Sequence, residues 1–469
     1  MKNIIDEKPE KLVIYINPPY AEATSATTQT GTGKHKSLVA RGNKISEDYK
    51  DILGNANNEI FAQFFIRIYK EIPNCIFSSF SKLKYINSAN FIQFRKYFKA
   101  KFLKGFICPA YTFDNVKGKF PIGFLIWDTK IKEKIKNITV DIYDVANKPD
   151  NNGQLPIVSK SQKGMQETNG SQRKNTQGVT TPCCIGKKNF YNNTENNINR
   201  WRAEFPKDGY FLGYIISQVA ADMQNNSQVA FLSKPQAKNC LSITDKNLIL
   251  FAIYLSVRQV IEPTWINDRD QFLYPNYKWE EDLEFQSDCL AFTLFHGQNR
   301  ITSEEGINHW IPFSEAEVEA KNNFESHFMK DFIDGKIKPK ETKEPNNNGQ
   351  LPIVSSHGNE HARGYNPLLL EAKSFIPTKP IKFSKEAKDI FEVGRELWKY
   401  YHKHDLININ ASYYDIRKFF QGVDSKSGRM NNKSIDETYN KLIGNLRERM
   451  KILAKKIEPK IYEFGFLKE

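Results

Sequence analysis

Short apolar runs alternate with amphipathic stretches over the first 145 residues of the chain. Residues 12–16 form a continuous apolar run that ends just before two prolines, which predicts a buried parallel strand followed by a loop. Residues 57–71 place apolar side chains at helical spacing after an Asn-rich start, and residues 75–80 form a second apolar run. The pattern therefore predicts a strand, a helix and a second strand in this order.

The next segments extend this order. Residues 91–102 have the pattern of a basic amphipathic helix, and residues 106–113 and 120–127 have that of two adjacent strands. Because neighbouring parallel strands are joined by right-handed helical crossovers, the order predicts half of a doubly wound α/β sheet in a first domain, residues 1–146. The end of the first strand is expected at the edge where such sheets bind ligands.

Polar, low-complexity sequence interrupts the chain twice. Residues 147–192 are dominated by Asn, Gln, Ser, Thr, Gly and Lys, so they hold too few apolar side chains to form a core. The nonapeptide NNGQLPIVS at 151–159 recurs at 347–355, inside a second loop at 341–370. Because no similarity surrounds the two copies, we interpret them as insertions into poorly ordered surface loops rather than as units of a repeat fold.

Two further regions complete the chain. Residues 193–340 mix short strands with helices, and we expect them to serve target recognition or packing. Residues 371–469 have a helical pattern, with one helix expected to begin at Ser384 and run through Tyr401.

A second C-terminal helix is expected to begin at a capping box formed by Ser434 and Glu437. Its apolar positions are spaced by threes and fours, as in a packing face. These positions are Ile435, Tyr439, Leu442, Leu446, Met450, Leu453 and Ile457.

The charge balance of the chain is basic. Lys and Arg number 68 against 54 Asp and Glu, which gives a formal net charge of +14 and a pI near 9.2. A polyanionic partner would explain this excess, and so would a base-composition bias towards Lys, Asn and Ile codons. The first dozen residues are charged, and the most apolar later stretch, 247–257, is too short to span a bilayer. We therefore expect a soluble cytoplasmic protein that contacts no membrane.

No motif for a metal or a nucleotide is assigned. The six cysteines form no Cys-x-x-Cys pair, and we expect free thiols in a reducing cytoplasm. HGNEH at 357–361 matches an inverted zinc-protease pattern, but it lies in a polar loop without the helix that would bring both histidines together. TGTGKHKS at 30–37 departs from the phosphate-binding loop pattern, because His35 stands where Ser or Thr belongs.

Asn17, Pro18, Pro19 and Tyr20 directly follow the first predicted strand. The exocyclic amine of adenine is a poor nucleophile because its lone pair is delocalised into the ring. The side-chain carbonyl of Asn17 and the backbone carbonyl of Pro18 are two acceptors that would hold both N–H bonds and aim the lone pair at a methyl donor. Tyr20 would offer an aromatic face to a base that has left the duplex. A simple strand-ending turn is the alternative, but the position between an apolar strand and a polar loop favours catalysis.

On the basis of this motif, residues 11–130 resemble part of the class I amino-methyltransferases of the adenine-specific DNA type. The part matched is the segment that runs from the catalytic motif of the family to the last strand of its sheet. The resemblance implies a Rossmann-like sheet, S-adenosylmethionine as methyl donor and a flipped adenine in double-stranded DNA as acceptor. It also implies that Asn17 and Pro18 hold the amine while Tyr20 stacks on the base. The expected fold is thus α/β: a partial Rossmann-like methyltransferase sheet, then a mixed α+β region and a helical C-terminal region.

Further candidate residues follow from the resemblance and from charge. The family has an aromatic residue before its final hairpin, which matches Phe113, with Phe120 as the other candidate for stacking on the base. Four basic residues after the motif are candidates for contacts to the DNA backbone: Lys34, Lys36, Arg41 and Lys44. The alternative is that they belong to a solvated loop. A basic face on one helix is expected at Arg95, Lys96, Lys99, Lys101 and Lys104. Such a face is more often exposed to solvent than bound to a partner.

The donor-binding part of the family has no counterpart in this sequence. Members bind the donor at a glycine-rich loop after their first strand, whereas only sixteen residues precede Asn17. The glycine motifs at 31–33 and 392–394 do not follow a buried strand. We therefore expect the chain to be a C-terminal part that an N-terminal methyltransferase half or subunit completes, or else a remnant.

The leading hypothesis is an adenine-specific DNA methyltransferase, as a fragment or subunit, in a restriction-modification system. One alternative is a non-catalytic DNA-binding accessory subunit that has kept the fold. Another is an enzyme that methylates amines of RNA or amides of proteins, because the NPPY motif is similar to theirs as well. The basic charge of the chain favours a nucleic acid over a protein as substrate.

Overall fold

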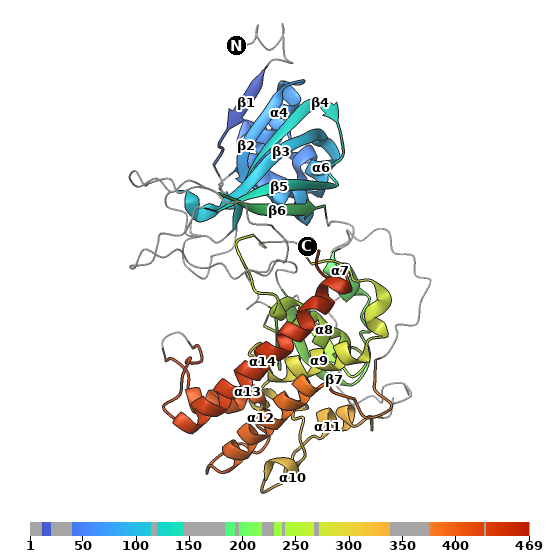
Figure 1. Cartoon of the computed structure of the whole chain (residues 1–469), viewed down its shortest axis with the longest axis vertical. Helices are drawn as coiled ribbons and strands as arrows, with labels where there is room; N and C mark the ends of the chain where they lie inside the picture. Colours follow the sequence, from blue (N-terminus) through green and yellow to red (C-terminus); the bar gives the residue numbers. More distant parts are fainter. Residues whose placement is uncertain are drawn as a thin grey trace, which may run out of the picture. The chain divides into compact units, whose positions relative to one another are not determined.

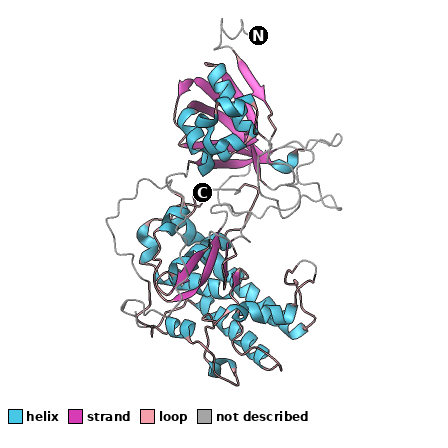
Figure 2. Cartoon of the chain, turned by 180° about the vertical axis from the view of Figure 1, so that it is seen from behind, coloured by secondary structure: helices cyan, strands magenta, loops and turns pink. Residues whose placement is uncertain are grey.

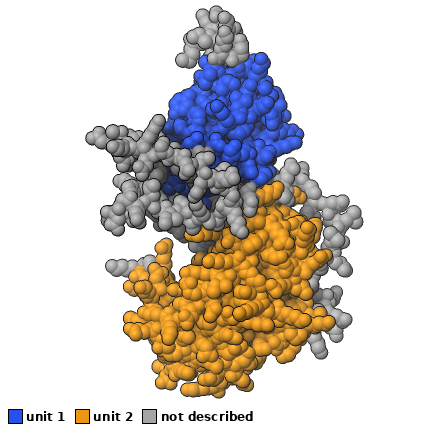
Figure 3. Space-filling model, in the orientation of Figure 1, with its two compact units in different colours: residues 1–196, 263–271, 469 blue, residues 197–262, 272–468 orange. Residues whose placement is uncertain are grey.

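The computed structural model describes ten segments of the chain, residues 12–19, 40–113, 120–144, 183–192, 197–217, 229–236, 240–266, 272–337, 375–425 and 428–468. The chain divides into two compact units (Figures 1 and 3). Unit 1 comprises residues 1–196, 263–271 and 469, and unit 2 comprises residues 197–262 and 272–468. The α/β character and the helical C-terminal region predicted from the sequence are confirmed.

Unit 1 is built on a six-stranded mixed sheet with the strand order β1-β2-β4-β3-β5-β6. The strands are β1 (Val13–Ile16), β2 (Ile76–Lys82), β3 (Ala100–Pro109), β4 (Pro121–Lys132), β5 (Asn137–Asp144) and β6 (Cys183–Tyr191). β1 and β2 are parallel neighbours, whereas β3 and β4 form an antiparallel hairpin whose second strand lies between β2 and β3. The predicted order of strand, helix, strand, helix and hairpin is therefore confirmed.

Helices cover one face of this sheet. They are α2 (Lys44–Asp48), α3 (Lys50–Leu53), α4 (Ile60–Glu71), α5 (Lys84–Asn87) and α6 (Ile92–Tyr97), with the 3-10 turns η2 (Gly54–Asn58), η3 (Ala89–Phe91) and η4 (Ala110–Thr112). In α4, Phe61, Phe65 and Ile68 follow helical spacing and are buried, and Phe65 packs on Phe77 of β2. Figure 1 views the strands from their open side, and Figure 2 shows the helices in front of them.

The second face of the sheet corrects the expectation for the first strand. A doubly wound sheet buries both faces, but along β2, β4 and β5 every other residue is buried and the residues between are mostly half-exposed. β1 is an edge strand, and Val13 and Tyr15 keep 64% and 60% of their surface exposed. Its apolar run, residues 12–16, indicated a strand buried on both faces, which is wrong, because Leu12, Ile14 and Ile16 pack on the core under the helices while Val13 and Tyr15 face the other way.

Two element boundaries of unit 1 also differ from the prediction. The helix expected at 91–102 ends at Tyr97, and the chain continues as β3 from Ala100, because pairing with β4 outweighs the local helical pattern. Residues 183–191, which the sequence analysis assigned to a disordered insert, form β6 against β5 and bury Phe190. The rest of that insert and the loop at 341–370, with both copies of the nonapeptide, lie outside the described residues.

A buried hydrogen bond in the unit 1 core makes a testable prediction. The indole Nε1–H of Trp127 donates to the hydroxyl of Tyr85 at 3.2 Å, and both side chains are almost fully buried. Tyr85→Phe removes the acceptor and leaves the buried indole N–H without a partner at this position. We therefore expect the free energy of unfolding of unit 1 to fall by about 1–3 kcal/mol. Urea denaturation followed by hydrogen exchange in β2 and β4 measures this.

The matched control for that prediction is Tyr97→Phe, because the Tyr97 ring is 40% exposed. Removing its hydroxyl should change the free energy of unfolding by less than about 0.5 kcal/mol. Equal effects of the two substitutions would contradict the assignment of Tyr85 as a buried acceptor.

Unit 2 packs helices around a small sheet with the strand order β10-β8-β7-β9. Its strands are β7 (Phe211–Ser217), β8 (Val229–Leu232), β9 (Leu241–Thr244) and β10 (Asn299–Arg300). Its helices are α7 (Ile198–Ala203), α8 (Leu248–Val260), α9 (Leu283–Phe295), α10 (Glu315–Val318), α11 (Phe328–Ile333), α12 (Lys385–His402), α13 (Tyr413–Gln421) and α14 (Glu437–Glu463), with 3-10 turns η6 (Tyr277–Glu280) and η7 (Ser303–Glu305). α8 is apolar around most of its circumference, as expected of a helix that is buried on all sides from Leu248 to Arg258.

The mixed region at 193–340 and the helical region at 371–469 share this one core, although the sequence analysis listed them separately. Ser384 caps α12 as predicted. The capping box of Ser434 and Glu437 is wrong, because Asp436 is the N-cap of α14 and accepts from the Tyr439 backbone N–H. Ile435 precedes the helix and is fully exposed, whereas the buried stripe runs from Tyr439 to Ile461.

His296 predicts a pH dependence for the stability of unit 2. Its ring stacks on Phe292, and Nδ1 accepts the backbone N–H of Gln298 at 3.2 Å. Burial, together with the nearby Arg417 charge, lowers the pKa of His296 to about 4. The unfolded chain therefore takes up a proton at His296 more readily than the folded chain does. The free energy of unfolding is unaffected by this group above the unfolded pKa of 6.5 and falls as the pH drops from 6.5 to 4.

His296 should contribute at most about 1.4 kcal/mol per pH unit to the slope of the free energy of unfolding against pH. Urea midpoints at pH 7, 6 and 5 measure it, and His296→Asn should flatten the curve. Some slope should remain, because burial also lowers the pKa of His309 and His402. A slope that is identical in wild type and His296→Asn would show that His296 does not carry the effect.

Candidate active site

The residues Asn17, Pro18 and Pro19 lie directly beyond the carboxyl end of β1, as predicted. β1 pairs in parallel with β2, with Ile16 opposite Ser79. Proline has no N–H to donate, so the ladder cannot continue through Pro18 and Pro19 and the chain must leave the sheet there. Asn17 is exposed and Pro18 is buried, which fixes a backbone carbonyl beside an accessible carboxamide. Tyr20 lies outside the described residues.

The hairpin β3–β4 brings the two candidate stacking residues to the same edge of the sheet. β3 ends at Pro109 opposite Pro121, the first residue of β4. Phe113 and Phe120 follow and precede these strand ends, and both pack on the buried cluster of Cys108, Ala110 and Ile122. The Ala110 N–H donates to the carbonyl of Phe120 at 2.8 Å, which ties the two segments together. Both rings are half-buried, so each keeps only part of its surface for a ligand.

Five aromatic residues form a row across the open face of the sheet, and the sequence analysis did not find it. The row consists of Tyr15, Phe80, Phe124, Phe106 and Tyr143, with neighbouring ring centroids 4.8–6.4 Å apart. Phe113 joins it by an edge contact with Phe80 at 5.4 Å. Tyr15 stands two residues before Asn17, so the row connects the first strand with the stacking candidate. The available signal was an aromatic residue in each predicted strand, such as Phe80 in 75–80 and Phe124 in 120–127.

The electrostatics of this edge leave its thiol and phenol protonated. Burial raises the pKa of the Cys108 thiol to about 11, which makes Cys108 a poor nucleophile at neutral pH. Burial and a hydrogen bond to the Asp144 carboxylate raise the pKa of Tyr111. The chemistry available at the motif itself is therefore hydrogen-bond acceptance by the carbonyl oxygens of Asn17 and Pro18.

The structure changes the interpretation of the basic candidates. Arg41 donates to the carboxamide of Asn58 in η2 at 3.2 and 3.0 Å, whereas Lys44 is exposed at the start of α2. Lys34 and Lys36 lie outside the described residues. The predicted basic helical face is wrong: Arg95 is buried and donates to the carbonyls of Tyr85 and Ser88. Lys101 and Lys104 belong to β3 rather than to the helix.

The glycines that the structure describes in unit 1 do not form the loop expected for a methyl donor. They lie inside strands, at Gly105, Gly123 and Gly186, or in turns next to helices, at Gly42 and Gly54. None of them directly follows a strand, where the glycine-rich loop of a dinucleotide or donor site belongs. In unit 2, the glycine of the 392–394 motif lies within α12. A Cβ at Gly394 would stand 2.4 Å from the Phe295 ring, so this glycine serves helix packing.

Among the described residues there is no group of three or more His, Cys, Asp or Glu side chains that could hold a metal ion. Within the same part of the chain, no helix combines the length and the apolarity that crossing a membrane requires.

Comparison with known proteins identifies no family for the chain. No family model matches it, and no curated protein matches it. Among solved structures, a chain of the ATP-dependent Type ISP restriction-modification enzyme LlaBIII bound to DNA aligns with 30% of this chain and 10% of its own length. The sequence identity is 11% and the TM-score is 0.19, so this likeness carries no conclusion about fold or function.

Proposed function

We propose that the chain carries the catalytic half of an adenine-specific DNA amino-methyltransferase. The observation that supports this most directly is the position of Asn17 and Pro18 beyond the carboxyl end of a strand paired in parallel with its neighbour. Open α/β sheets bind their ligands at this edge. A Rossmann-like sheet for unit 1 is part of the same proposal.

Two acceptor oxygens explain how this edge would act on adenine. The amine of the base would donate one N–H to the Asn17 carboxamide oxygen and the other to the Pro18 carbonyl oxygen. Holding both N–H bonds draws the nitrogen towards tetrahedral geometry, so that its lone pair leaves the ring system and points at the methyl donor. Since Pro18 is buried, its carbonyl cannot swing away from this position. The nitrogen loses a proton once it carries the methyl group, so no strong base is required.

Aromatic side chains at the same edge would receive the base. An adenine can be methylated at its amine only after it has left the stack of the duplex. Phe113 and Phe120 flank the strand ends beside the motif, and Phe113 contacts Phe80 of the aromatic row. A base stacked there would be held by ring contact, while affinity for DNA would come mainly from Lys and Arg side chains at phosphates.

S-adenosylmethionine would supply the methyl group, and an N-terminal methyltransferase half or subunit would supply its site. The register of β1 turns the backbone groups of Val13 and Tyr15 away from β2, because Ile76 instead bonds the carbonyl of Leu12. The outer edge of β1 is thus open to another strand within the described part of unit 1. We infer that an N-terminal methyltransferase half continues the sheet beyond β1.

The experiment that tests the proposal is a methyl-transfer assay. The chain is combined with the product of an adjoining upstream reading frame that carries a glycine-rich donor motif, together with duplex DNA and radiolabelled S-adenosylmethionine. Label on adenine amines supports the proposal. DNA binding without label transfer would favour the accessory-subunit alternative, and label on RNA or protein would favour the other methyltransferases.

A further inference from the structure

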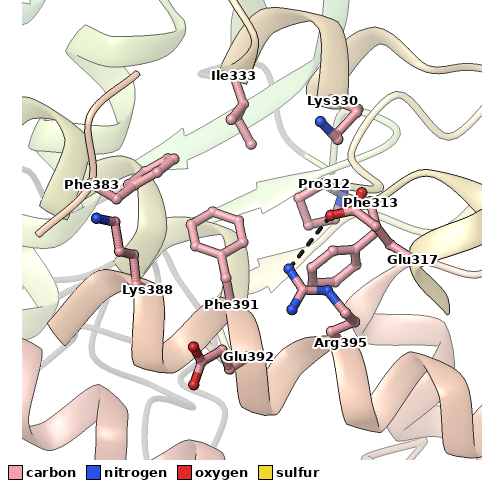
Figure 4. A pocket seen from close by; sticks show the side chains of 10 residues that line it. All are labelled: Pro312, Phe313, Glu317, Lys330, Ile333, Phe383, Lys388, Phe391, Glu392 and Arg395. Atoms are coloured by element: carbon pink, nitrogen blue, oxygen red, sulfur yellow. Dashed lines mark hydrogen bonds and ion pairs between the residues drawn. The ribbon is translucent and has the colours of Figure 1, made fainter. Parts of the chain in front are cut away.

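A hollow in unit 2, separate from the motif at Asn17, lies between α10, α11 and α12. Its volume is about 260 Å³. Lys388, Phe391, Glu392 and Arg395 line it from one side of α12, because residues three and four apart share a helix face. Figure 4 shows their side chains together with those from α10, α11 and the segments before α10 and α12.

Aromatic rings form the walls of this hollow. The centroids of Phe383 and Phe391 lie 4.7 Å apart, and Phe313, which is only 1% exposed, meets Phe391 edge-on at 6.2 Å. Ile333 of α11 closes the wall opposite α12 (Figure 4). An apolar cavity of about 150 Å³ accommodates benzene, so the space here suits a larger planar ring. Aromatic walls of this kind bind planar rings by stacking and edge contacts.

Cationic groups stand around these rings. Arg395 lies over the Phe313 ring at 5.6 Å, and its Nη2 is 3.5 Å from a Glu317 carboxylate oxygen. The Nε–H of Arg395 is buried and has no hydrogen-bond partner among the described residues. Lys330 donates to both carboxylate oxygens of Asp334, at 2.7 and 2.8 Å, and is therefore ion-paired.

Carboxylates offset two of the three cations of the lining, since Glu317 faces Arg395 and Asp334 pairs with Lys330. Glu317 already accepts from the backbone N–H and hydroxyl of Ser314 as well as facing Arg395. The Glu392 carboxylate points away from the rings in Figure 4. Lys388 reaches from α12 to the side of Phe383, and no described carboxylate forms an ion pair with it. Lys388 therefore adds a positive charge to the apolar walls that no carboxylate among the described residues pairs with.

We propose that this hollow binds a small molecule made of a planar ring and an anionic group. The ring lies against Phe383, Phe391 and Phe313, and the anion accepts from Lys388. Nucleoside monophosphates and aromatic carboxylates share this chemistry. The proposal is independent of methyl transfer, since none of these residues belongs to the motif in unit 1.

Titration calorimetry on the full chain tests this with four probes: adenosine 5′-monophosphate, adenosine, inorganic phosphate and benzoate. Adenosine lacks the anion and phosphate lacks the ring, so each should bind at least about tenfold more weakly than the monophosphate. Comparing the monophosphate with benzoate distinguishes a nucleotide from an aromatic carboxylate as the natural ligand. Equal affinities for the monophosphate and phosphate would overturn the role of the aromatic walls.

A matched pair of substitutions on α12 locates the binding. Lys388→Met should weaken the tightest probe by about tenfold, because a charged donor is lost from the hollow. Lys385→Met, one turn earlier and outside the lining, should leave the affinity unchanged. Both lysines are exposed, so both variants should fold. Saturable binding that Lys388→Met leaves intact, or no binding of any probe, would overturn the proposal.

Discussion

Replacing Asn17 by alanine is expected to reduce methyl transfer to adenine by about two to three orders of magnitude in kcat, while affinity for duplex DNA stays within about threefold. In the proposed mechanism the Asn17 carboxamide oxygen would act on the amine mainly in the transition state, so its loss should lower kcat more than it weakens binding. Under the proposed function, affinity for DNA would come from phosphate contacts of other Lys and Arg side chains. A methyl-transfer assay on the completed enzyme and anisotropy with labelled duplex DNA measure the two quantities.

Asn17→Asp is the matched control for the alanine variant. An aspartate keeps an acceptor oxygen at the end of β1, so it should retain much more activity than alanine. Because Asn17 is exposed, neither substitution should unfold unit 1. Full activity in the Asn17→Ala protein would mean that residues 17–20 form only a turn. Equal loss in both variants would mean that the carboxamide N–H, rather than the oxygen, is required.

Binding of S-adenosylmethionine is expected only when the N-terminal half is present, and Val13→Pro should weaken association with that half by at least about tenfold. Proline at this position removes an N–H that points away from β2, so the ladder between β1 and β2 should stay intact. The added strand would lose a hydrogen-bond donor and meet the proline ring instead. Calorimetry with the donor and co-purification of the two polypeptides provide the measurements.

Val13→Ala is the control at the same site, since it shortens the exposed side chain and keeps the N–H. It should associate nearly as well as the wild type. Tight donor binding by the chain alone would contradict the proposal that an N-terminal half or subunit supplies the donor site. Unchanged association of the Val13→Pro protein would show that the added half docks elsewhere than at the edge of β1.

Local pattern predicted the first half of unit 1 because its elements are specified by nearby residues. The helical spacing of Phe61, Phe65 and Ile68 gives α4, and the apolar run before Asn17 gives β1. That run could not show that β1 is an edge strand, since strand order depends on residues far away in sequence. β6 was missed for a similar reason, as its polar residues form a strand only because β5 offers an edge to pair with.

The candidate site was predictable only in part. The position of Asn17 and Pro18 follows from the strand and the prolines, and Phe113 and Phe120 are now seen at the same edge of the sheet. The row from Tyr15 to Tyr143 was not predicted, because it requires the register of five strands. The prediction of a basic helical face was wrong because the Arg95 side chain turns inward and donates hydrogen bonds to the carbonyls of Tyr85 and Ser88. The pattern of charges along the sequence does not reveal this contact.

The pairing of β5 with β6 bears on how this gene can change in length. Asp144 and Cys183 are direct partners in the ladder, although 38 residues separate them along the chain. The entropy of closing such a connection grows only with the logarithm of its length, so doubling it adds about 0.6 kcal/mol. Selection on folding therefore acts weakly on insertions at this point and strongly on the two strands beside it. One copy of the duplicated nonapeptide lies here, where added codons are tolerated best.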